Sequence, residues 1–242
     1  MGVDHAPPRA YHAALNGRIR PHDRWRVAGE AYYKHYAHLL SLDYTALGGD
    51  PGTAVAPSDA IAATDGYALG GGLGLTRDGP LLQTTLRYDW SRSHRRFPGR
   101  FGDERVPVPW NQPHWLSLST EMKATEALRL MVRGERAWGR SWGFRQTYYD
   151  YLGGQSNIES VLGRSLNAPS THVLAPRTRI DLGLRYTLQW SDLVLEARLD
   201  VINVLDRANP FDWGVRPTDD GMTRTTRRLP GRRAVGGLTV RY

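Results

Sequence analysis

Acid, base and nucleophile side chains are spread thinly along this sequence of 242 residues. There is no cysteine, which excludes a disulfide framework and cysteine-based metal sites. The eight histidines show no metal-ligand spacing, and His35 and His38 would lie on opposite faces of an extended strand. No serine-nucleophile elbow is present. We therefore expect no catalytic residue, no metal site, no cofactor and no enzyme activity.

Aromatic rings and arginines are the residue types in this sequence that suit ligand binding. The net charge of +8 comes almost wholly from arginine, because Lys34 and Lys123 are the only lysines. These arginines are scattered and no nucleic-acid-binding motif occurs, so we expect no nucleic-acid partner. Flat rings and guanidinium groups suit glycans and anionic chelates. The expected substrate-binding residues all lie in long connecting segments: Trp110, Tyr148, Tyr149, Tyr151 and Trp213. Their alternative role is packing within the loops or in an interfacial aromatic girdle.

The elements that position these residues are strands with one apolar and one polar face. From Ile180 to Leu188 every second residue is apolar, and the same alternation resumes from Leu193 to Val201. Period-two alternation predicts a strand, and two such runs joined by a short turn predict a hairpin. The sequence closes on a further alternating run that ends at Tyr242.

Nine alternating runs can be traced, and the segments between them are short and long in strict turn. The runs lie near 11–19, 24–40, 67–75, 82–90, 115–122, 128–144, 180–188, 193–201 and 234–242. The short connections are 20–23, 77–80, 123–126 and 190–192, and the long ones are 42–65, 93–112, 145–175 and 206–229. A membrane barrel explains this order, because short turns lie at its periplasmic rim and long loops at the other rim. A soluble sandwich has no reason to separate them.

The sequence thus predicts an all-β fold: a partial antiparallel transmembrane β-barrel of about nine strands. Hydropathy agrees, because no run of 18 apolar residues occurs and a helical membrane protein is excluded. Closed single-chain bacterial barrels have an even number of strands and a signal peptide. Nine is odd, and the first eight residues have neither a basic n-region nor an apolar h-region. We therefore expect residues 1–242 to be one portion of a larger barrel protein.

The alternation also predicts which side chains face lipid and which face the lumen of the barrel. The side chains expected to face lipid are Leu182, Leu184, Leu193, Leu195, Leu199, Val240 and Tyr242. Those expected to face the lumen are Asp181, Arg185, Glu196, Arg198, Asp200 and Arg241. The glycine-rich run 70–74 fits a small, close-packed barrel position or a bulge better than a nucleotide-binding loop.

The last third of the sequence carries motifs that resemble the carboxy-terminal strands of TonB-dependent outer-membrane receptors. In that family the penultimate strand tends to end in Asn-aliphatic-Leu-Asp/Asn-Arg/Lys, and the final strand tends to follow a Pro-Gly/Pro-Arg lead and to end on Phe. This sequence matches the first pattern with Asn203, Asp206 and Arg207, and the second with Pro230 and Arg232. It ends on Tyr242 where the family has Phe. The resemblance is close over 174–242 and looser upstream, where Pro113–Leu118 resembles an earlier strand start.

The resemblance implies a role, a location and a set of partners. It implies a protein of the outer membrane of a Gram-negative bacterium that takes up a scarce solute of the siderophore, cobalamin or glycan class. The implied partners are outer-membrane lipid, TonB and the ligand of the full-length receptor, and the barrel-insertion machinery. Leu238, Val240 and Tyr242 resemble the signal that this machinery recognises in a last strand. The plug domain, the TonB-binding motif and the signal peptide of the family are expected to be absent from residues 1–242.

One alternative comes from a different class of protein. A small outer-membrane barrel hydrolase would place its active site at the rim that carries the long loops. Acidic residues and histidines do occur near those loops, namely Asp89, His94, Asp103 and His114. The odd number of strands argues against this alternative.

Overall fold

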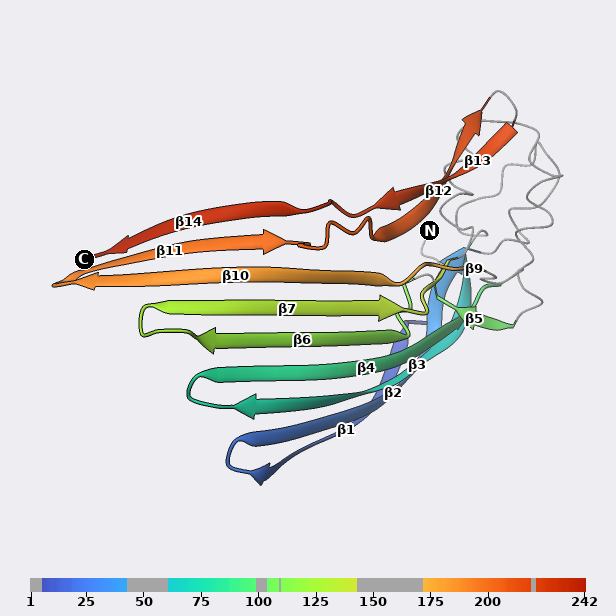
Figure 1. Ribbon diagram of the computed structural model, residues 1–242. Helices are drawn as coiled ribbons and strands as arrows, with labels where there is room; N and C mark the ends of the chain where they lie inside the picture. The colour runs from blue at the N-terminus through green and yellow to red at the C-terminus, as the bar shows by residue number, and fades with distance from the viewer. Residues whose placement is uncertain (1–5, 43–60, 99–103, 109, 143–171, 219–220) are drawn as a thin grey trace.

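The computed structural model describes residues 6–42, 61–98, 104–108, 110–142, 172–218 and 221–242. These residues form strands and connecting segments (Figure 1). In these ranges, no helix has the length and apolar character needed to cross a membrane.

Nine long strands build one antiparallel sheet in which neighbours in space are also neighbours in sequence, apart from short intervening strands. They are β1 (Arg9–His22), β2 (Trp25–Leu42), β3 (Ile61–Asp78), β4 (Leu82–Arg96), β6 (His114–Lys123), β7 (Leu128–Trp138), β10 (Arg177–Trp190), β11 (Leu193–Ile202) and β14 (Arg233–Arg241). The short β5 (Arg105–Pro107) pairs with β4. The predicted all-β fold, with nine long strands paired in order, is confirmed.

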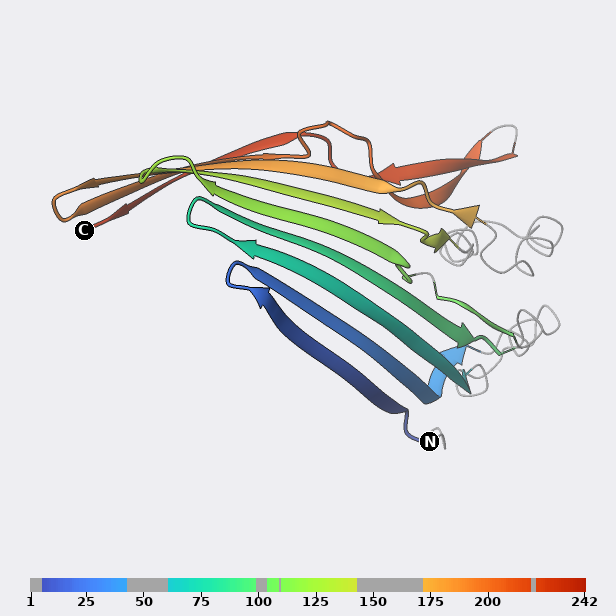
Figure 2. The ribbon, with the colours of Figure 1, turned by 60° about the horizontal axis from the view of Figure 1, so that its bottom comes forward.

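The sheet is curved, and the strand ends joined by short turns lie opposite the strand ends from which the longer connecting segments leave (Figures 1 and 2). The turns 23–24, 79–81, 124–127 and 191–192 define one end, which we name the turn rim. The opposite end, where β2, β4, β7 and β11 finish, is named the loop rim. The predicted separation of short turns from long loops is therefore confirmed.

The segments predicted as long loops contain more strand than expected. β3 begins at Ile61, and Leu39–Leu42 pair with Ile61–Thr64 after an irregularity at His38, which has a φ of 54°. Within 206–229, β12 (Pro210–Thr218) and β13 (Gly221–Arg228) form a hairpin. β8 (Ser141–Trp142) pairs with β9 (His172–Val173). Alternating Phe211, Trp213 and Val215 explain β12, since aromatic and β-branched residues favour strands even beside proline.

Cross-strand register gives the sheet two chemically different faces. On one face, Ile19, Val27, Leu75, Leu86, Leu118, Gly134 and Ile180 lie opposite one another in a single row across seven strands. A second such row consists of Leu82, Met122, Leu130, Leu184, Leu199 and Gly236. We name this side the apolar face. The other side carries Glu30, Arg87, Asp89, Arg133, Asp181, Arg185 and Asp200, and we name it the charged face.

The register confirms that the residues expected to face lipid and those expected to face the lumen lie on opposite faces of the sheet. Leu182, Leu184 and Leu199 belong to the apolar face, and Asp181, Arg185 and Asp200 to the charged face. Buried apolar side chains in the described ranges are few: Phe97, Val106, Val108, Ala137 and Leu174. They lie near the loop rim, so the large sheet has no packed core beneath its apolar face.

Candidate functional site

Ion pairs cover much of the charged face. Arg179 lies 2.9 Å from Asp181, Arg185 lies 3.3 Å from Glu196, and Arg198 pairs with Asp200. Toward the turn rim, Arg26 pairs with Asp78 at 2.6 Å. Charges of both signs are thus interspersed and largely neutralised in pairs, as expected of a surface in contact with water.

The tightest cluster on the charged face has one arginine between two carboxylates. The Arg87 guanidinium lies 2.5 Å from Glu30 and 2.7 Å from Asp89. Gly72 makes room for it: a Cβ there would lie 2.9 Å from the Arg87 guanidinium and 3.4 Å from Glu30, and closer still to Asp89. Gly70 likewise gives space to the Tyr32 hydroxyl, 2.7 Å from a Cβ placed there. Of the two alternatives for run 70–74, the structure shows close packing at Gly70, Gly71 and Gly72, with continuous register and no bulge.

A hollow of about 170 Å³ opens on the same face beside Gly183. Its lining combines Met131 with three arginines and two aspartates. A Cβ on Gly183 would lie 2.9 Å from the Met131 methyl and 3.0 Å from Asp200, so glycine keeps this hollow open. Arg133 contributes the one guanidinium of its lining without an ion-pair partner in the described part of the chain.

Trp110 is the predicted binding residue whose side chain the structure places. It is 59% exposed, and the Arg95 guanidinium lies 5.7 Å from its ring centroid. Close by in sequence, Arg105 lies 2.5 Å from Asp65, and Arg96 lies 3.4 Å from the same carboxylate. An accessible ring beside a guanidinium at the loop rim has the chemistry expected of a site for anionic or glycan ligands.

The other predicted binding residues are not brought to this position. Trp213 lies in β12 opposite Thr226, and its side chain is outside the described part of the structure. Tyr148, Tyr149 and Tyr151 fall in 143–171, which is also outside the described residues. Their role in binding remains a prediction.

The family-motif residues form a structural node where β11 ends. Asn203 is 2% exposed; its amide donates to the Arg207 carbonyl at 3.0 Å and its Oδ1 accepts from the Arg207 N–H at 3.2 Å. The same amide lies 3.5 Å from the Pro230 carbonyl. The Arg232 N–H donates to Asp206 at 2.8 Å, which ties the start of β14 to the turn. These residues therefore hold strands together instead of presenting a ligand site.

Asn209 completes this node and was not among the predicted site residues. It is 1% exposed, and its side-chain amide pairs with both backbone groups of Thr178, as a residue of a neighbouring strand would. The Thr178 N–H donates to Asn209 Oδ1 at 2.8 Å, and Asn209 Nδ2 donates to the Thr178 carbonyl at 2.8 Å. An Asn-Pro pair after a strand marks a turn in sequence, but its partner 31 residues away cannot be found without the fold.

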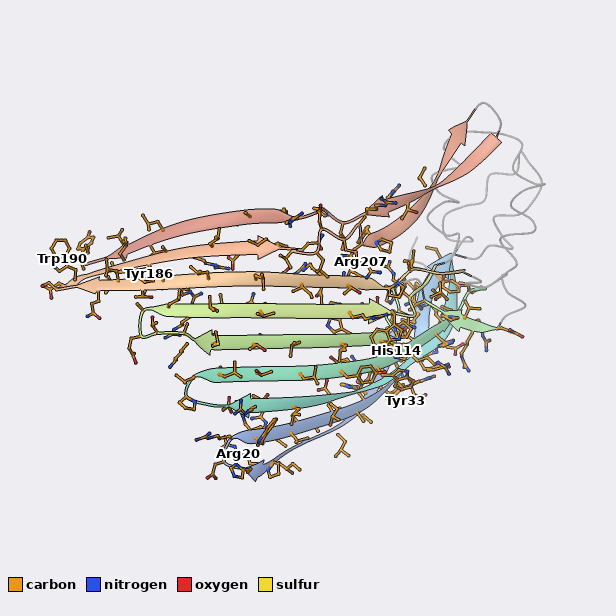
Figure 3. All side chains as sticks on the ribbon, viewed as in Figure 1. Arg20, Tyr33, His114, Tyr186, Trp190 and Arg207 are labelled. Atoms are coloured by element: carbon orange, nitrogen blue, oxygen red, sulfur yellow. The ribbon has the colours of Figure 1, made fainter. Side chains whose placement is uncertain are left out.

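Aromatic side chains collect on the apolar face at both ends of the sheet. At the loop rim, His114 stacks on Trp138 with centroids 5.0 Å apart and lies 2.7 Å from the Tyr88 hydroxyl. Tyr67 stacks on His94 at 5.2 Å. Figure 3 shows Tyr33 and His114 near the loop rim, and Tyr186 and Trp190 near the turn rim. Aromatic side chains thus border the apolar face across β3, β4, β6 and β7 at the loop rim and on β10 at the turn rim.

The residues of the hydrolase alternative do not converge. Asp89 lies on the charged face in the Arg87 cluster, whereas His94 and His114 lie on the apolar face in stacked pairs. Asp103 is outside the described residues. Among the described residues, no group of three histidine, aspartate or glutamate side chains could hold a metal ion.

The predicted insertion residues share one face of the last strand. Leu238 and Val240 lie opposite Ala197 and Leu195 on the apolar face. Tyr242 follows β14 at the turn rim and is fully exposed. Whether these side chains are recognised by an insertion machinery remains a prediction.

Comparison with known proteins finds no matching family model and no matching curated sequence. Solved structures do match. The outer membrane transporter YddB from Escherichia coli matches at 15% identity with a TM-score of 0.62, over 98% of this chain and 33% of that one. The ferripyoverdine receptor of the outer membrane of Pseudomonas aeruginosa matches at 16% identity with a TM-score of 0.59, over 97% of this chain and 27% of that one. The ferric-catecholate import receptor Fiu from E. coli matches at 12% identity with a TM-score of 0.58, over 98% of this chain and 28% of that one.

The chain spans about a third or less of the length of these proteins. Its neighbours are transporters and receptors. The resemblance predicted from the carboxy-terminal motifs is therefore confirmed at the level of the fold. The chain has the fold of a portion of the β-barrel of TonB-dependent outer-membrane receptors.

Proposed function

We propose that this chain is part of an outer-membrane receptor that takes up a scarce solute with energy delivered through TonB, and that its strands are the carboxy-terminal part of the barrel. In this proposal the apolar face contacts lipid, the charged face lines the lumen, and the loop rim faces the cell exterior. The proposal extends the likeness in fold to location, partners and activity.

The single observation that carries this proposal is an inverted pattern of exposure. Along β10, Leu182, Leu184 and Leu188 are 41%, 37% and 46% exposed, while Asp181 and Arg185 on the other face are half-buried. β4 shows the same inversion. In water such a face would be unfavourable, because each CH₂ group left exposed to water loses about 0.8 kcal/mol of the stabilisation that burial provides. In a bilayer the same apolar side chains would contact lipid chains, and no such cost would arise.

The height of the apolar face also fits a membrane. β7 runs for 11 residues from Leu128, which lies opposite Tyr186, to Trp138. At about 3.3 Å per residue and a tilt of about 45°, this length covers about 25 Å of bilayer, which matches the apolar band of such barrels. The aromatic side chains near the two rims then lie at the two interfaces, where amphipathic rings are favoured.

We further propose a ferric siderophore as the solute class. The similar structures include a ferric-catecholate import receptor and a receptor bound to ferripyoverdine. Trp110 with Arg95 at the loop rim supports this choice, since an exposed ring and a guanidinium suit a flat anionic chelate.

Uptake of radiolabelled iron tests the proposal. Cells that lack the chromosomal gene should lose uptake of one ferric siderophore out of a panel, and the gene should restore it. Uptake should stop in a strain without TonB. A panel that includes cobalamin and oligosaccharides separates the solute classes. Loss of cobalamin uptake alone would replace the siderophore assignment, and no loss with any solute would contradict a transport role.

Cysteine labelling tests the membrane assignment independently, because the chain contains no native cysteine. Leu184→Cys should react only with a lipid-soluble maleimide, whereas Thr187→Cys on the charged face should react with a water-soluble one. Equal labelling of both sites by both reagents would contradict the assignment of the faces.

A further inference from the structure

We propose that the hollow beside Gly183 is a second binding site for the solute, and that it holds an aromatic carboxylate group through Arg133. This inference rests on the proposed function, because it requires the charged face to line a lumen through which the solute passes. It assigns a site at mid-height of this face, apart from the loop rim where Trp110 lies.

The charges that line this hollow leave one guanidinium in excess. Of its three arginines, two are paired with its two aspartates. Arg133, the third, lies directly opposite Asp181 in register. Both oxygens of that carboxylate are already engaged, because Oδ2 lies 2.9 Å from Arg179 and Oδ1 accepts the Asn203 N–H at 2.8 Å. Arg133 is exposed and has no ion-pair partner in the ranges that the structure describes. One anionic group would therefore balance the lining.

The size and the wall of the hollow suit an aromatic ring beside that charge. Its volume is about 170 Å³, and a cavity of about 150 Å³ is known to hold a benzene molecule. Met131 and Ile202 supply an apolar wall, and a thioether makes favourable contacts with aromatic rings. A guanidinium binds a carboxylate through two parallel N–H···O bonds. A benzoate-like group satisfies both parts, whereas the aliphatic carboxylate of a protein side chain would leave the apolar wall uncovered.

Gly183 keeps the space for this group. A Cβ at this position would lie 2.9 Å from the Met131 methyl and 3.0 Å from Asp200 Oδ1, so both would have to shift. The neighbouring positions of β10 on the same face carry the charged side chains of Asp181 and Arg185. The hollow therefore depends on a single missing side chain in an otherwise charged row.

The height of the hollow suits a second contact with the solute and not the first. Gly183 precedes Leu184, which lies in the middle of the apolar face, so the hollow lies at about the same level on the charged face. Trp110 and Arg95 lie at the loop rim. Arginine and lysine outnumber carboxylates on the described strands of the charged face, so the field of this face attracts anions. An anionic group that has left the loop rim can thus be held again at mid-height.

Binding of para-fluorobenzoate to the purified full chain in detergent tests this inference, with fluorine NMR as the readout. Para-fluorobenzamide is the comparison ligand that has the ring without the charge, and acetate has the charge without the ring. We expect saturable binding of para-fluorobenzoate. The amide should bind at least about tenfold more weakly, and acetate should compete poorly.

Two variants test charge and shape separately. Arg133→Gln should weaken binding of para-fluorobenzoate at least about tenfold, and Gly183→Ala should weaken it to a similar degree because the new methyl group displaces its neighbours into the hollow. Arg129→Gln is the control for charge, since Arg129 lies on the same strand and face but pairs with Glu121 at 3.2 Å. Gly74→Ala is the control for shape, because a Cβ there would have its nearest contact at 3.8 Å. Both controls should bind as the native chain does.

Three results would each overturn the inference: equal binding by the native chain and Arg133→Gln, equal binding of the amide, or an equal loss in Arg129→Gln. Competition by acetate as strong as that by unlabelled benzoate would show a carboxylate site without a ring and overturn the aromatic assignment. Heat-modifiability in detergent shows whether Gly183→Ala is folded. If it is not, the result for Arg133→Gln decides, because replacing an exposed side chain that has no ion-pair partner in the described structure should leave the fold unchanged.

Uptake in cells separates failure of this inference from failure of the proposed function. If the gene supports uptake of no solute, the proposed function fails. If it does support uptake, Arg133→Gln should lower the rate of uptake severalfold, while binding of the solute to de-energised cells, which uses the loop rim, should not change. An unchanged rate of uptake would overturn the second site and leave the proposed function standing.

Discussion

At the scale of single residues, the side chains that look most like a motif act as strand connectors. Asn203 and Asn209 are almost fully buried, and both use their amides on backbone groups of other segments. A buried backbone N–H or C=O that loses its partner costs about 1–3 kcal/mol. Asparagine is therefore required at these positions for stability, even though neither residue faces a hollow or the loop rim surface around Trp110.

We expect Asn209→Ala to destabilise the folded protein by about 2–4 kcal/mol, because both backbone groups of Thr178 lose their partner. The measurement is the free energy of unfolding by guanidinium in lipid vesicles. Asn16→Ala is the control, since Asn16 is exposed on β1, and it should change stability by less than about 0.5 kcal/mol. Similar values for the two variants would contradict the proposed role of Asn209.

Gly72 makes a second residue-level prediction. Its missing side chain leaves space for the Glu30–Arg87–Asp89 cluster. We expect Gly72→Ala to cost about 1–3 kcal/mol through overpacking. Gly237→Ala is the matched change on the charged face, where a Cβ would meet nothing within 4 Å, so it should be neutral or slightly stabilising in the same unfolding assay. A neutral Gly72→Ala variant would show that the cluster shifts freely.

At the scale of elements, local alternation is enough to predict the long strands. β10 and β11 keep strict period two because one face of each must be apolar along its whole length. β12 and β13 were missed because Pro210 and Pro217 in β12 favour a loop in the sequence, and β13 has no alternation of apolar and polar residues. The Asn209–Thr178 contact and the hollow beside Gly183 could not be predicted, since they depend on register between distant strands.

The assignment of the faces predicts the effect of a misplaced charge. Leu184 lies between Leu130 and Leu199 in the middle of the apolar face. We expect Leu184→Arg to destabilise the protein in vesicles by about 2–4 kcal/mol, the cost of arginine near the bilayer centre. Thr187→Arg places the same charge on the charged face opposite Glu196, and there it should change stability by less than about 1 kcal/mol. Equal effects of both variants would contradict the assignment.

At the scale of the whole molecule, the two outer strands β1 and β14 set a limit on closure. Both run from the loop rim to the turn rim, because they are the first and the ninth strand of an antiparallel series. Pairing β1 directly with β14 would therefore need a parallel seam in a sheet whose other pairs are antiparallel. All described residues of β1 and β14 are exposed. Each edge is thus suited to receive an antiparallel strand from elsewhere.

The free edge of β14 leads to the last prediction, which concerns assembly. An edge strand with unpaired backbone groups can be recognised by strand addition, in which main-chain bonds give affinity and alternate side chains give specificity. Leu238, Val240 and the terminal Tyr242 supply such an alternate set. We expect deletion of Tyr242 to lower the fraction of heat-modifiable protein in the outer membrane severalfold at equal expression, and Tyr242→Phe to preserve it. Arg241→Ala, on the other face of β14, should have little effect. Unchanged insertion after the deletion would leave Tyr242 only the role of an interfacial aromatic residue at the turn rim.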